Sequence, residues 1–308
     1  MTEIVGFVGM SHSPFATMTP PESPDAPGAA FMAATRRVAK AVAELAPDVA
    51  VVVGADHFHA NFYDVMPPFV LGVEQASGFG DFGTTPGPLP VAGDLAWTVR
   101  DGLTAAGFDI ALSYALTVDH GIVQSYEMAG AGGLPMVPLM VNTAAPPLPG
   151  LDRCVALGRA LGDVLRAAPG RRRVLVIASG GLSHWLPSND PRALDGDRRA
   201  AVINGRADVR SVAAVREPRV RAMGGNPDAR VAESWDNWFL DRLSAGDLDG
   251  VSAIGDAQLE RDAGSGGHEV RTWLVGQAAA DLPLVWTDYE PVPEWITGMG
   301  AGATFAVD

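Results

Sequence analysis

The chain has 308 residues, of which 47% are hydrophobic, so it has enough apolar sequence for one large α/β domain or two small ones. Its 22 Lys and Arg residues against 36 Asp and Glu residues give a net charge of −14, which is the wrong sign for binding nucleic acid or an anionic membrane. The single cysteine, Cys154, excludes an intramolecular disulfide and any metal site built from several cysteines.

The first residues, Met1-Thr2-Glu3-Ile4-Val5, lack the basic segment and the long apolar segment of a signal peptide, and no later apolar run has membrane-spanning length. The lone cysteine fits a reducing compartment. We therefore expect a cytoplasmic protein with neither nucleic acid nor a membrane among its partners.

Apolar runs rich in valine and isoleucine recur along the chain, and their lengths and flanking Gly or Asp residues predict buried strands. These runs cover residues 4–8, 49–53, 69–73, 110–116, 136–141 and 174–177. Helical periodicity lies between them, over 29–45, 92–106, 123–129 and 151–168. This alternation predicts an α/β fold with three layers, αβα, around a central mostly parallel or mixed sheet.

The stretch 191–245 carries arginine clusters and few strand-like runs, and a helix start is predicted near 266–273. We expect residues 1–308 to form a single catalytic domain with a more helical segment at about 191–281. The Gly- and Pro-rich stretches are short and varied in composition, which predicts ordered surface loops around a cleft.

Five of the six histidines lie in short turns that contain Gly, Ser or Asp, and four of these turns follow a predicted strand. In open α/β sheets, ligands bind outside the carboxyl ends of the strands. We therefore expect His12, His57, His120 and His184 to meet in one site at that edge. Histidine is the commonest metal ligand and moves protons near neutral pH.

The other two histidines are predicted to lie outside this cluster. His59 would point to the opposite side of an extended segment from His57, as a peripheral or supporting group. His268 adjoins Glu269, which is either a metal-binding carboxylate or an acidic residue favoured by the helix dipole. Two histidines and a carboxylate with open positions suit an oxygen-activating Fe(II) site, but Zn²⁺ with an activated water accepts the same donors.

Short segments spread over nearly the whole chain resemble the class III extradiol ring-cleaving dioxygenases. The matching segments include Ser11-His12-Ser13-Pro14, Asp56-His57, Gly80-Asp81-Phe82-Gly83, Asp119-His120-Gly121, Gly180-Gly181-Leu182-Ser183-His184, Trp235-Asp236-Asn237, His268-Glu269 and Pro293-Glu294-Trp295-Ile296. Each segment is weak alone, and their order and coverage make the resemblance specific.

The resemblance implies that His12, His57 and Glu269 hold Fe(II) and that His120 and His184 are an acid/base pair. We assign to His184 the removal of a catechol proton and to His120 the protonation that accompanies O–O cleavage. The implied substrates are O2 and a small aromatic diol such as 2,3-dihydroxyphenylpropionate, opened to a hydroxymuconic semialdehyde-type product. A homo-oligomer is also implied.

Asp56 and Asp119 each precede a histidine of this set, so they are candidates for orienting the imidazoles or, equally, for capping turns. Trp185 follows His184 at a position where members of this family often carry a polar residue. His59 stands at a position where a close relative in the family has no histidine. Two other functions compete with the dioxygenase: a zinc-dependent hydrolase on a related scaffold, and a non-catalytic binding protein of the same superfamily.

Overall fold

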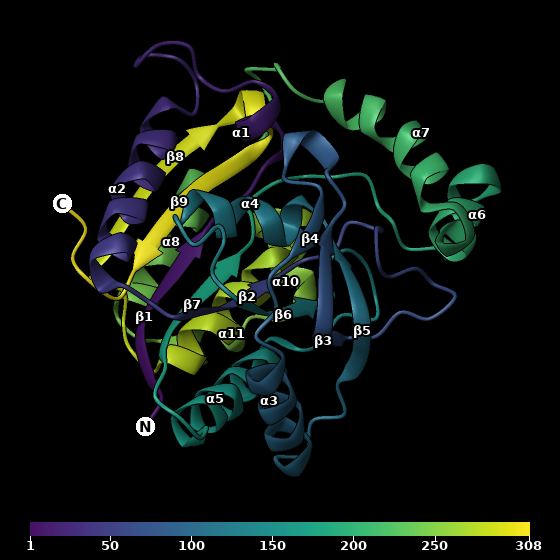
Figure 1. Cartoon of the computed structure of the whole chain (residues 1–308). Helices are drawn as coiled ribbons and strands as arrows, with labels where there is room; N and C mark the ends of the chain where they lie inside the picture. The colour runs from purple at the N-terminus through teal and green to yellow at the C-terminus, as the bar shows by residue number, and fades with distance from the viewer.

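The computed structural model describes residues 1–308, and all the apolar runs predicted as strands lie in one nine-stranded sheet (Figure 1). These strands are β1 (Glu3–Met10), β2 (Val49–Gly54), β3 (Phe69–Gly78), β5 (Ala111–Val118), β6 (Met136–Val141) and β7 (Arg173–Ser179). The sheet also contains β4 (Gly87–Leu89), β8 (Trp286–Val292) and β9 (Thr297–Ala303), which the sequence did not predict.

The predicted helices are α2 (Ala29–Leu45), α3 (Gly93–Ala105), α4 (His120–Met128) and α5 (Leu151–Ala167). Helix α11 (Val270–Ala280) follows the helix start predicted near 266–273, and the further helices are α1 (Pro14–Met18), α6 (Gly196–Asn204), α7 (Val209–Arg221), α8 (Glu233–Ser244), α9 (Leu248–Ser252) and α10 (Asp256–Ala263). Single 3₁₀ turns are η1 (Asp81–Gly83), η2 (Gly205–Asp208), η3 (Gly266–Glu269) and η4 (Pro293–Trp295). No helix combines the length and the apolarity needed to cross a membrane.

The sheet order is β4-β3-β6-β2-β7-β1-β9-β8, with β5 paired to β3. Strands β6, β2, β7 and β1 are mutually parallel, whereas β9 runs antiparallel to β1 and β3 runs antiparallel to β6. The prediction of a mostly parallel or mixed sheet is therefore confirmed, with a parallel centre and antiparallel flanks.

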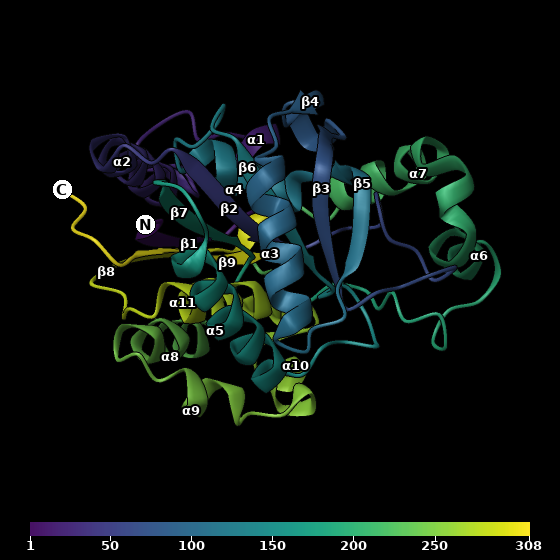
Figure 2. The ribbon, with the colours of Figure 1, turned by 60° about the horizontal axis from the view of Figure 1, so that its bottom comes forward.

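Helices cover both faces of the sheet, because side chains of each central strand alternate between two cores. In β2, Val49, Val51 and Val53 pack in one core with residues of α3, α5, α8 and α11. Ala50 and Val52 pack in the other core with residues of α1, α2 and α4. Figure 2 shows the sheet between these helical layers, with α6 and α7 projecting to one side. The three-layer prediction is confirmed.

Strand β9 was not predicted because almost none of its residues favours a strand; its sequence is Thr297-Gly-Met-Gly-Ala-Gly-Ala. Its glycines are required by close packing. A Cβ at Gly300 would lie 2.7 Å from Leu182, and one at Gly302 would lie 2.6 Å from Leu284. Tight packing of the strand against its neighbours overrides its weak local preference.

The strands β1, β2 and β7 all end at the same edge of the sheet, where His12, His57 and His184 follow them. His120 follows β5, which runs against these strands because it is parallel to β3. It reaches the same place because α4 begins against the end of β2, where a Cβ at Gly121 would lie 2.8 Å from both Ala55 O and His57 Cε1. The helix begins three residues earlier than predicted, since the Asp119 side chain caps it.

Candidate active site

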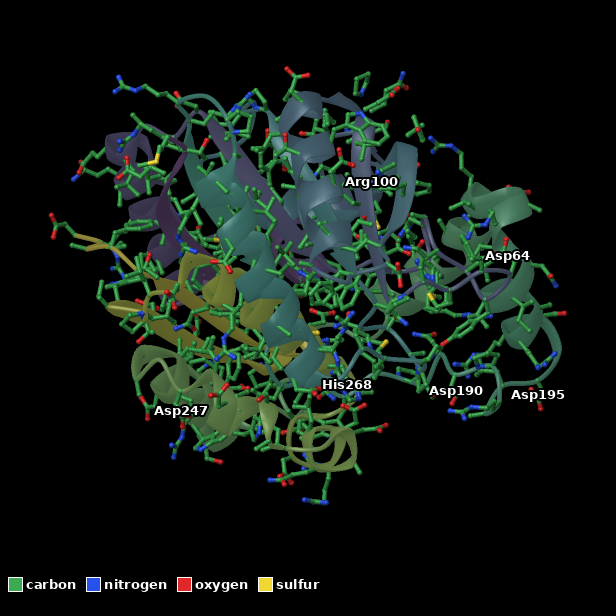
Figure 3. The ribbon with its side chains drawn as sticks, turned by 90° about the horizontal axis from the view of Figure 1, so that it is seen from below. Asp64, Arg100, Asp190, Asp195, Asp247 and His268 are labelled. Carbon is green, nitrogen blue, oxygen red and sulfur yellow. The ribbon has the colours of Figure 1, made fainter.

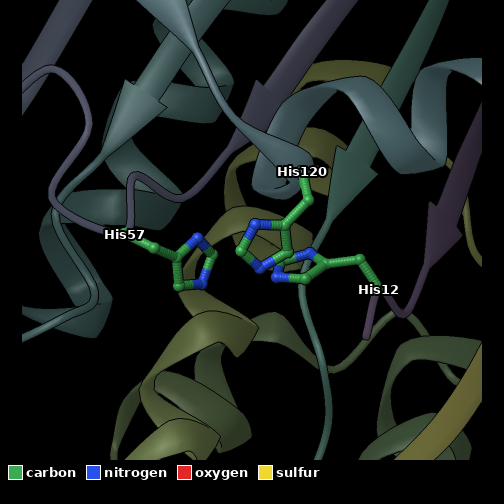
Figure 4. Close-up of side chains that lie close together, drawn as sticks. All are labelled: His12, His57 and His120. Carbon is green, nitrogen blue, oxygen red and sulfur yellow. The ribbon is translucent and has the colours of Figure 1, made fainter. Parts of the chain in front are cut away.

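Three of the predicted histidines face one another at this edge of the sheet, as Figure 4 shows. The rings of His57 and His120 stack with centroids 4.2 Å apart, and the His12 ring lies 5.2 Å from His57 and 5.3 Å from His120 in edge-on contact. One nitrogen of each lies within 4.8 Å of the others, a spacing that could hold a metal ion.

Glu269 brings a carboxylate to these imidazoles from η3, at the start of α11. Its Oε2 lies 3.3 Å from His12 Nε2, and its Oε1 lies 3.2 Å from His57 Nε2 and 3.8 Å from His184 Nε2. The backbone N–H of Gly181 donates to Oε2 at 2.6 Å. Gly180 permits this approach, because a Cβ there would lie 2.7 Å from the Glu269 carbonyl oxygen.

His12 is held from behind by a chain of hydroxyl groups. Its Nδ1 lies 3.0 Å from Ser179 Oγ, which donates to Ser125 Oγ at 2.7 Å, and Ser125 donates to the Met10 carbonyl at 3.2 Å. Because both hydroxyl protons are directed along this chain, Ser179 accepts the proton of Nδ1. The lone pair of His12 Nε2 is therefore left facing Glu269.

The other three imidazoles are also bound through Nδ1. His57 Nδ1 lies 3.3 Å from an Asp119 oxygen, His120 Nδ1 lies 2.5 Å from Asp81, and His184 Nδ1 donates to the Leu182 carbonyl at 2.8 Å. Each ring therefore has Nε2 free for the site, and an acceptor behind a histidine fixes the tautomer that ligates a metal or exchanges protons.

The charges of the site suit a cation. Burial alone would raise the pKa of Glu269, but His12, His57 and His184 hold it below its usual range, so the carboxylate is ionised. Burial lowers the pKa of His12 to about 3, against the opposing effect of Glu269, so its imidazole is neutral. Neutral imidazole and ionised carboxylate are the forms that bind metals.

His57 lies between two carboxylates. Burial alone would lower its pKa, but Asp119 and Glu269 raise the pKa of His57 well above its usual value. A divalent cation at Nε2 would take the place of the proton there, as expected when metal binding releases protons. The donor set of two imidazoles and one carboxylate, with a third imidazole alongside, therefore fits a metal ion.

Asp119 and Asp56 act differently. Asp119 accepts from the His57 backbone N–H at 2.6 Å and contacts its imidazole, while also capping α4. Asp56 makes no hydrogen bond to an imidazole and accepts instead from the backbone N–H groups of His59, Ala60 and Asn61. Asp56 therefore only caps a turn, whereas Asp119 both caps a helix and contacts an imidazole.

The segment from His57 to His59 is not extended, so that part of the expectation for His59 was wrong. Phe58 has a φ of +60°, so the chain turns between the two histidines. As a result His59 Nδ1 lies 2.8 Å from an oxygen of Asp119, the same carboxylate that contacts His57.

His268 and Trp185 contact arginine side chains, and neither belongs to the group of His12, His57, His120 and Glu269. His268 Nδ1 lies 2.8 Å from Arg271, among the helices on the underside of the sheet (Figure 3). The Arg230 guanidinium stacks over the Trp185 ring at 3.7 Å.

Two carboxylates in the site were not assigned a role from the sequence. Asp81 holds both the Nδ1 and the backbone N–H of His120, the latter at 3.0 Å. Asp236 is fully buried and binds the Ser183 backbone N–H at 2.8 Å and its hydroxyl at 2.7 Å, next to His184. Both lie in segments that carried the family resemblance, which was the available signal.

Residues 6–300 match the family described as the catalytic LigB subunit of aromatic ring-opening dioxygenase. The chain belongs to this family. The membership confirms the resemblance and the prediction of a ring-cleaving dioxygenase, and it favours that function over the hydrolase and the binding protein. The LigB family also implies a catalytic metal, for which the convergent donors supply a site.

Several relatives share the name 2,3-dihydroxyphenylpropionate/2,3-dihydroxicinnamic acid 1,2-dioxygenase. The protein from Burkholderia vietnamiensis is 37% identical over 291 residues, which cover 89% of this chain and 91% of the relative. One from a Rhodococcus species is 36% identical, with 99% of both chains covered. One from Paraburkholderia xenovorans is 39% identical, with 84% and 85% covered. The similarity to these relatives therefore extends over most of this chain.

Proposed function

We propose that the chain is an Fe(II)-dependent extradiol dioxygenase that cleaves 2,3-dihydroxyphenylpropionate or a related substituted catechol with O2 to a hydroxymuconic semialdehyde-type product. The observation that carries the proposal is the convergence of His12, His57 and His120, with Glu269 within 3.3 Å of the first two. The names of the relatives support the substrate.

In this proposal His12, His57 and Glu269 hold the iron, since their donor atoms form one contiguous group. Such a two-histidine, one-carboxylate set is typical of non-haem Fe(II) oxygenases. When bound, Fe(II) supplies the redox chemistry with O2 and makes the catechol hydroxyl more acidic.

His184 is proposed to remove a catechol proton. Its Nδ1 proton is donated to a neutral carbonyl, that of Leu182, which leaves a basic Nε2 lone pair on the site side, 3.8 Å from Glu269. His120 is proposed to donate a proton as the O–O bond breaks. It is backed by the carboxylate of Asp81, and a carboxylate at Nδ1 stabilises the positively charged imidazolium. The different partners behind the two rings therefore support the different roles.

The proposal is tested by loading the protein anaerobically with Fe(II) and offering 2,3-dihydroxyphenylpropionate, unsubstituted catechol and 2-aminophenol with an oxygen electrode as readout. We expect oxygen uptake and a yellow ring-opened product with the carboxylated catechol. The Zn²⁺-loaded protein should consume no oxygen. Failure of the Fe(II)-loaded protein to consume oxygen with any catechol would contradict the proposal.

We also propose that the whole chain is a single catalytic domain and assembles as a homo-oligomer. The first strand, β1, pairs with the last, β9, in one sheet, which supports the single domain. Sedimentation equilibrium tests the assembly, and a monomer mass at micromolar concentration would contradict it.

A further inference from the structure

We propose that His59 is a positioning residue: by donating from Nδ1 to Asp119, it fixes the carboxylate that orients His57 for metal binding. The inference rests on the proposed function, in which His57 holds the iron. It gives a task to a histidine that stands next to the site without belonging to the predicted ligands or the proton-transfer pair.

The contact between His59 and Asp119 is the shorter of the two imidazole contacts on that carboxylate. His59 Nδ1 lies 2.8 Å from Asp119 Oδ2, whereas His57 Nδ1 lies 3.3 Å from the same oxygen. The side chains of His59 and Asp119 are 1% and 0% exposed. A buried contact of this length is a strong restraint on the carboxylate.

The proton of this hydrogen bond belongs to His59. Asp119 accepts from the backbone N–H groups of His57 at 2.6 Å and Gly121 at 2.8 Å, so it acts as an acceptor throughout. The nearest other polar group to His59 Nδ1 is the Arg216 guanidinium at 3.5 Å, which is itself a donor and binds the His57 carbonyl oxygen. His59 therefore donates from Nδ1 to the carboxylate.

The second nitrogen of His59 has no such task. Nε2 is buried and has no hydrogen-bond partner, and the ring packs against Phe79 with centroids 4.2 Å apart. The backbone of His59 is held separately, by Asp56 at 3.2 Å. The Nδ1–H group is thus the only polar group of the side chain that is in use.

The trio Asp56, His59 and Asp119 also has the spacing of a metal site, with donor atoms within 4.8 Å of one another. Its oxygens are already engaged. Asp56 accepts from three successive backbone N–H groups and Asp119 from two. These N–H groups already compensate much of the negative charge on the two carboxylates, so we interpret the trio as a hydrogen-bond network and not as a second metal site.

Loss of the donor should act on metal affinity. Without His59 Nδ1–H, the Oδ2 atom of Asp119 keeps the backbone N–H of His57 but loses its shortest side-chain contact, so the carboxylate is held less firmly against the His57 imidazole. Removing a partner that orients a metal ligand typically lowers metal affinity by about 10- to 100-fold.

Two substitutions separate donor position from polarity. In His59→Asn the amide nitrogen is attached to Cγ, as Nδ1 is, and can donate to Asp119 from the same place. In His59→Gln the same amide is one bond further out, near the unused Nε2 position. The measurement is the Fe(II) dissociation constant by anaerobic titration without substrate, with the thermal unfolding temperature of the metal-free proteins as a fold control.

We expect His59→Asn to bind Fe(II) within about threefold of the unmodified protein and His59→Gln to bind about 10- to 100-fold more weakly. Equal affinity for both variants, whether unchanged or reduced, would overturn the inference, because the position of the donor would then not matter. If the unmodified protein itself bound no Fe(II), the proposed function would fail and this inference with it. If the unmodified protein bound Fe(II) and both variants bound it equally weakly, this inference would fail but the proposed function would be unaffected.

Discussion

Replacing Asp81 by Asn should remove the acid role proposed for His120 while leaving the metal bound. The two oxygens of Asp81 accept from the backbone N–H of His120 at 3.0 Å and from its Nδ1–H at 2.5 Å. An amide offers only one oxygen. Since the backbone N–H can only donate, the oxygen of Asn pairs with it, and the amide NH2 faces Nδ1.

The size of the effect follows from this geometry. The imidazolium form of His120 carries a proton on both nitrogens, and in the Asn variant its Nδ1–H meets another donor in a buried site, where the His120 side chain is 4% exposed. The charged acid form is therefore lost. General acid catalysis contributes about 10²- to 10⁴-fold, so turnover should fall by about that factor, or roughly 3 to 5 kcal/mol of transition-state stabilisation.

The assay is single-turnover ring cleavage by the Fe(II)-loaded variant, followed by the yellow product, with iron content measured on the same sample. Asp101→Asn serves as the matched control, because that carboxylate is 67% exposed and pairs only with Arg100. Turnover of Asp81→Asn within about threefold of the control would refute the role given to the Asp81–His120 pair.

Three further outcomes are expected. In Gly266→Ala the new Cβ would overlap the His184 imidazole, so turnover should fall at least ~10²-fold while iron is retained. A fully active variant would show that catalysis does not depend on the position of the His184 ring. Burial and then Arg271 lower the pKa of His268 to about 4 from an ordinary 6.5. Between pH 6.5 and pH 4 the unfolded chain therefore binds a proton at His268 that the folded chain does not. The free energy of unfolding should thus be highest above pH 6.5 and fall by about 3 kcal/mol as the pH falls to 4. Urea unfolding of His268→Gln should lose less stability over that range than the unmodified protein, and an identical pH dependence would contradict the assignment. Burial raises the pKa of the Cys154 thiol to about 12, so a disulfide reagent at pH 8 should react only after unfolding, and fast labelling of the folded protein would count against this.

Elements with a strong periodic pattern could be predicted from the sequence. The bounds of α2 and β6 agree with their predicted ranges, because continuous apolar periodicity and flanking turn residues define them. Strand β9 could not be predicted, because its glycines and alanines are selected by close contacts with Leu182 and Leu284 that exist only in the folded protein.

The candidate site divides in the same way. Its histidines could be chosen because each follows a recognisable strand in a short turn. The position of Glu269 at a helix start left two interpretations open, and only the family resemblance favoured the metal ligand. The partner of His120 could not, since Asp81 lies 39 residues away, and the family resemblance marked its segment without showing that the two side chains pair. The shared contact of His57 and His59 with Asp119 was missed because a positive φ at Phe58 is not visible in its residue type.

The central claim is that the site contains three metal ligands and two proton-transfer groups. Substitutions at His120 and Glu269 test this claim most directly. Both lie beside His12 and His57 at metal-binding distance. The direct measurement is iron content after anaerobic reconstitution of Glu269→Gln and His120→Gln. We predict that His120→Gln keeps close to one iron per chain and that Glu269→Gln keeps almost none. Iron retained by Glu269→Gln and lost from His120→Gln would contradict the account.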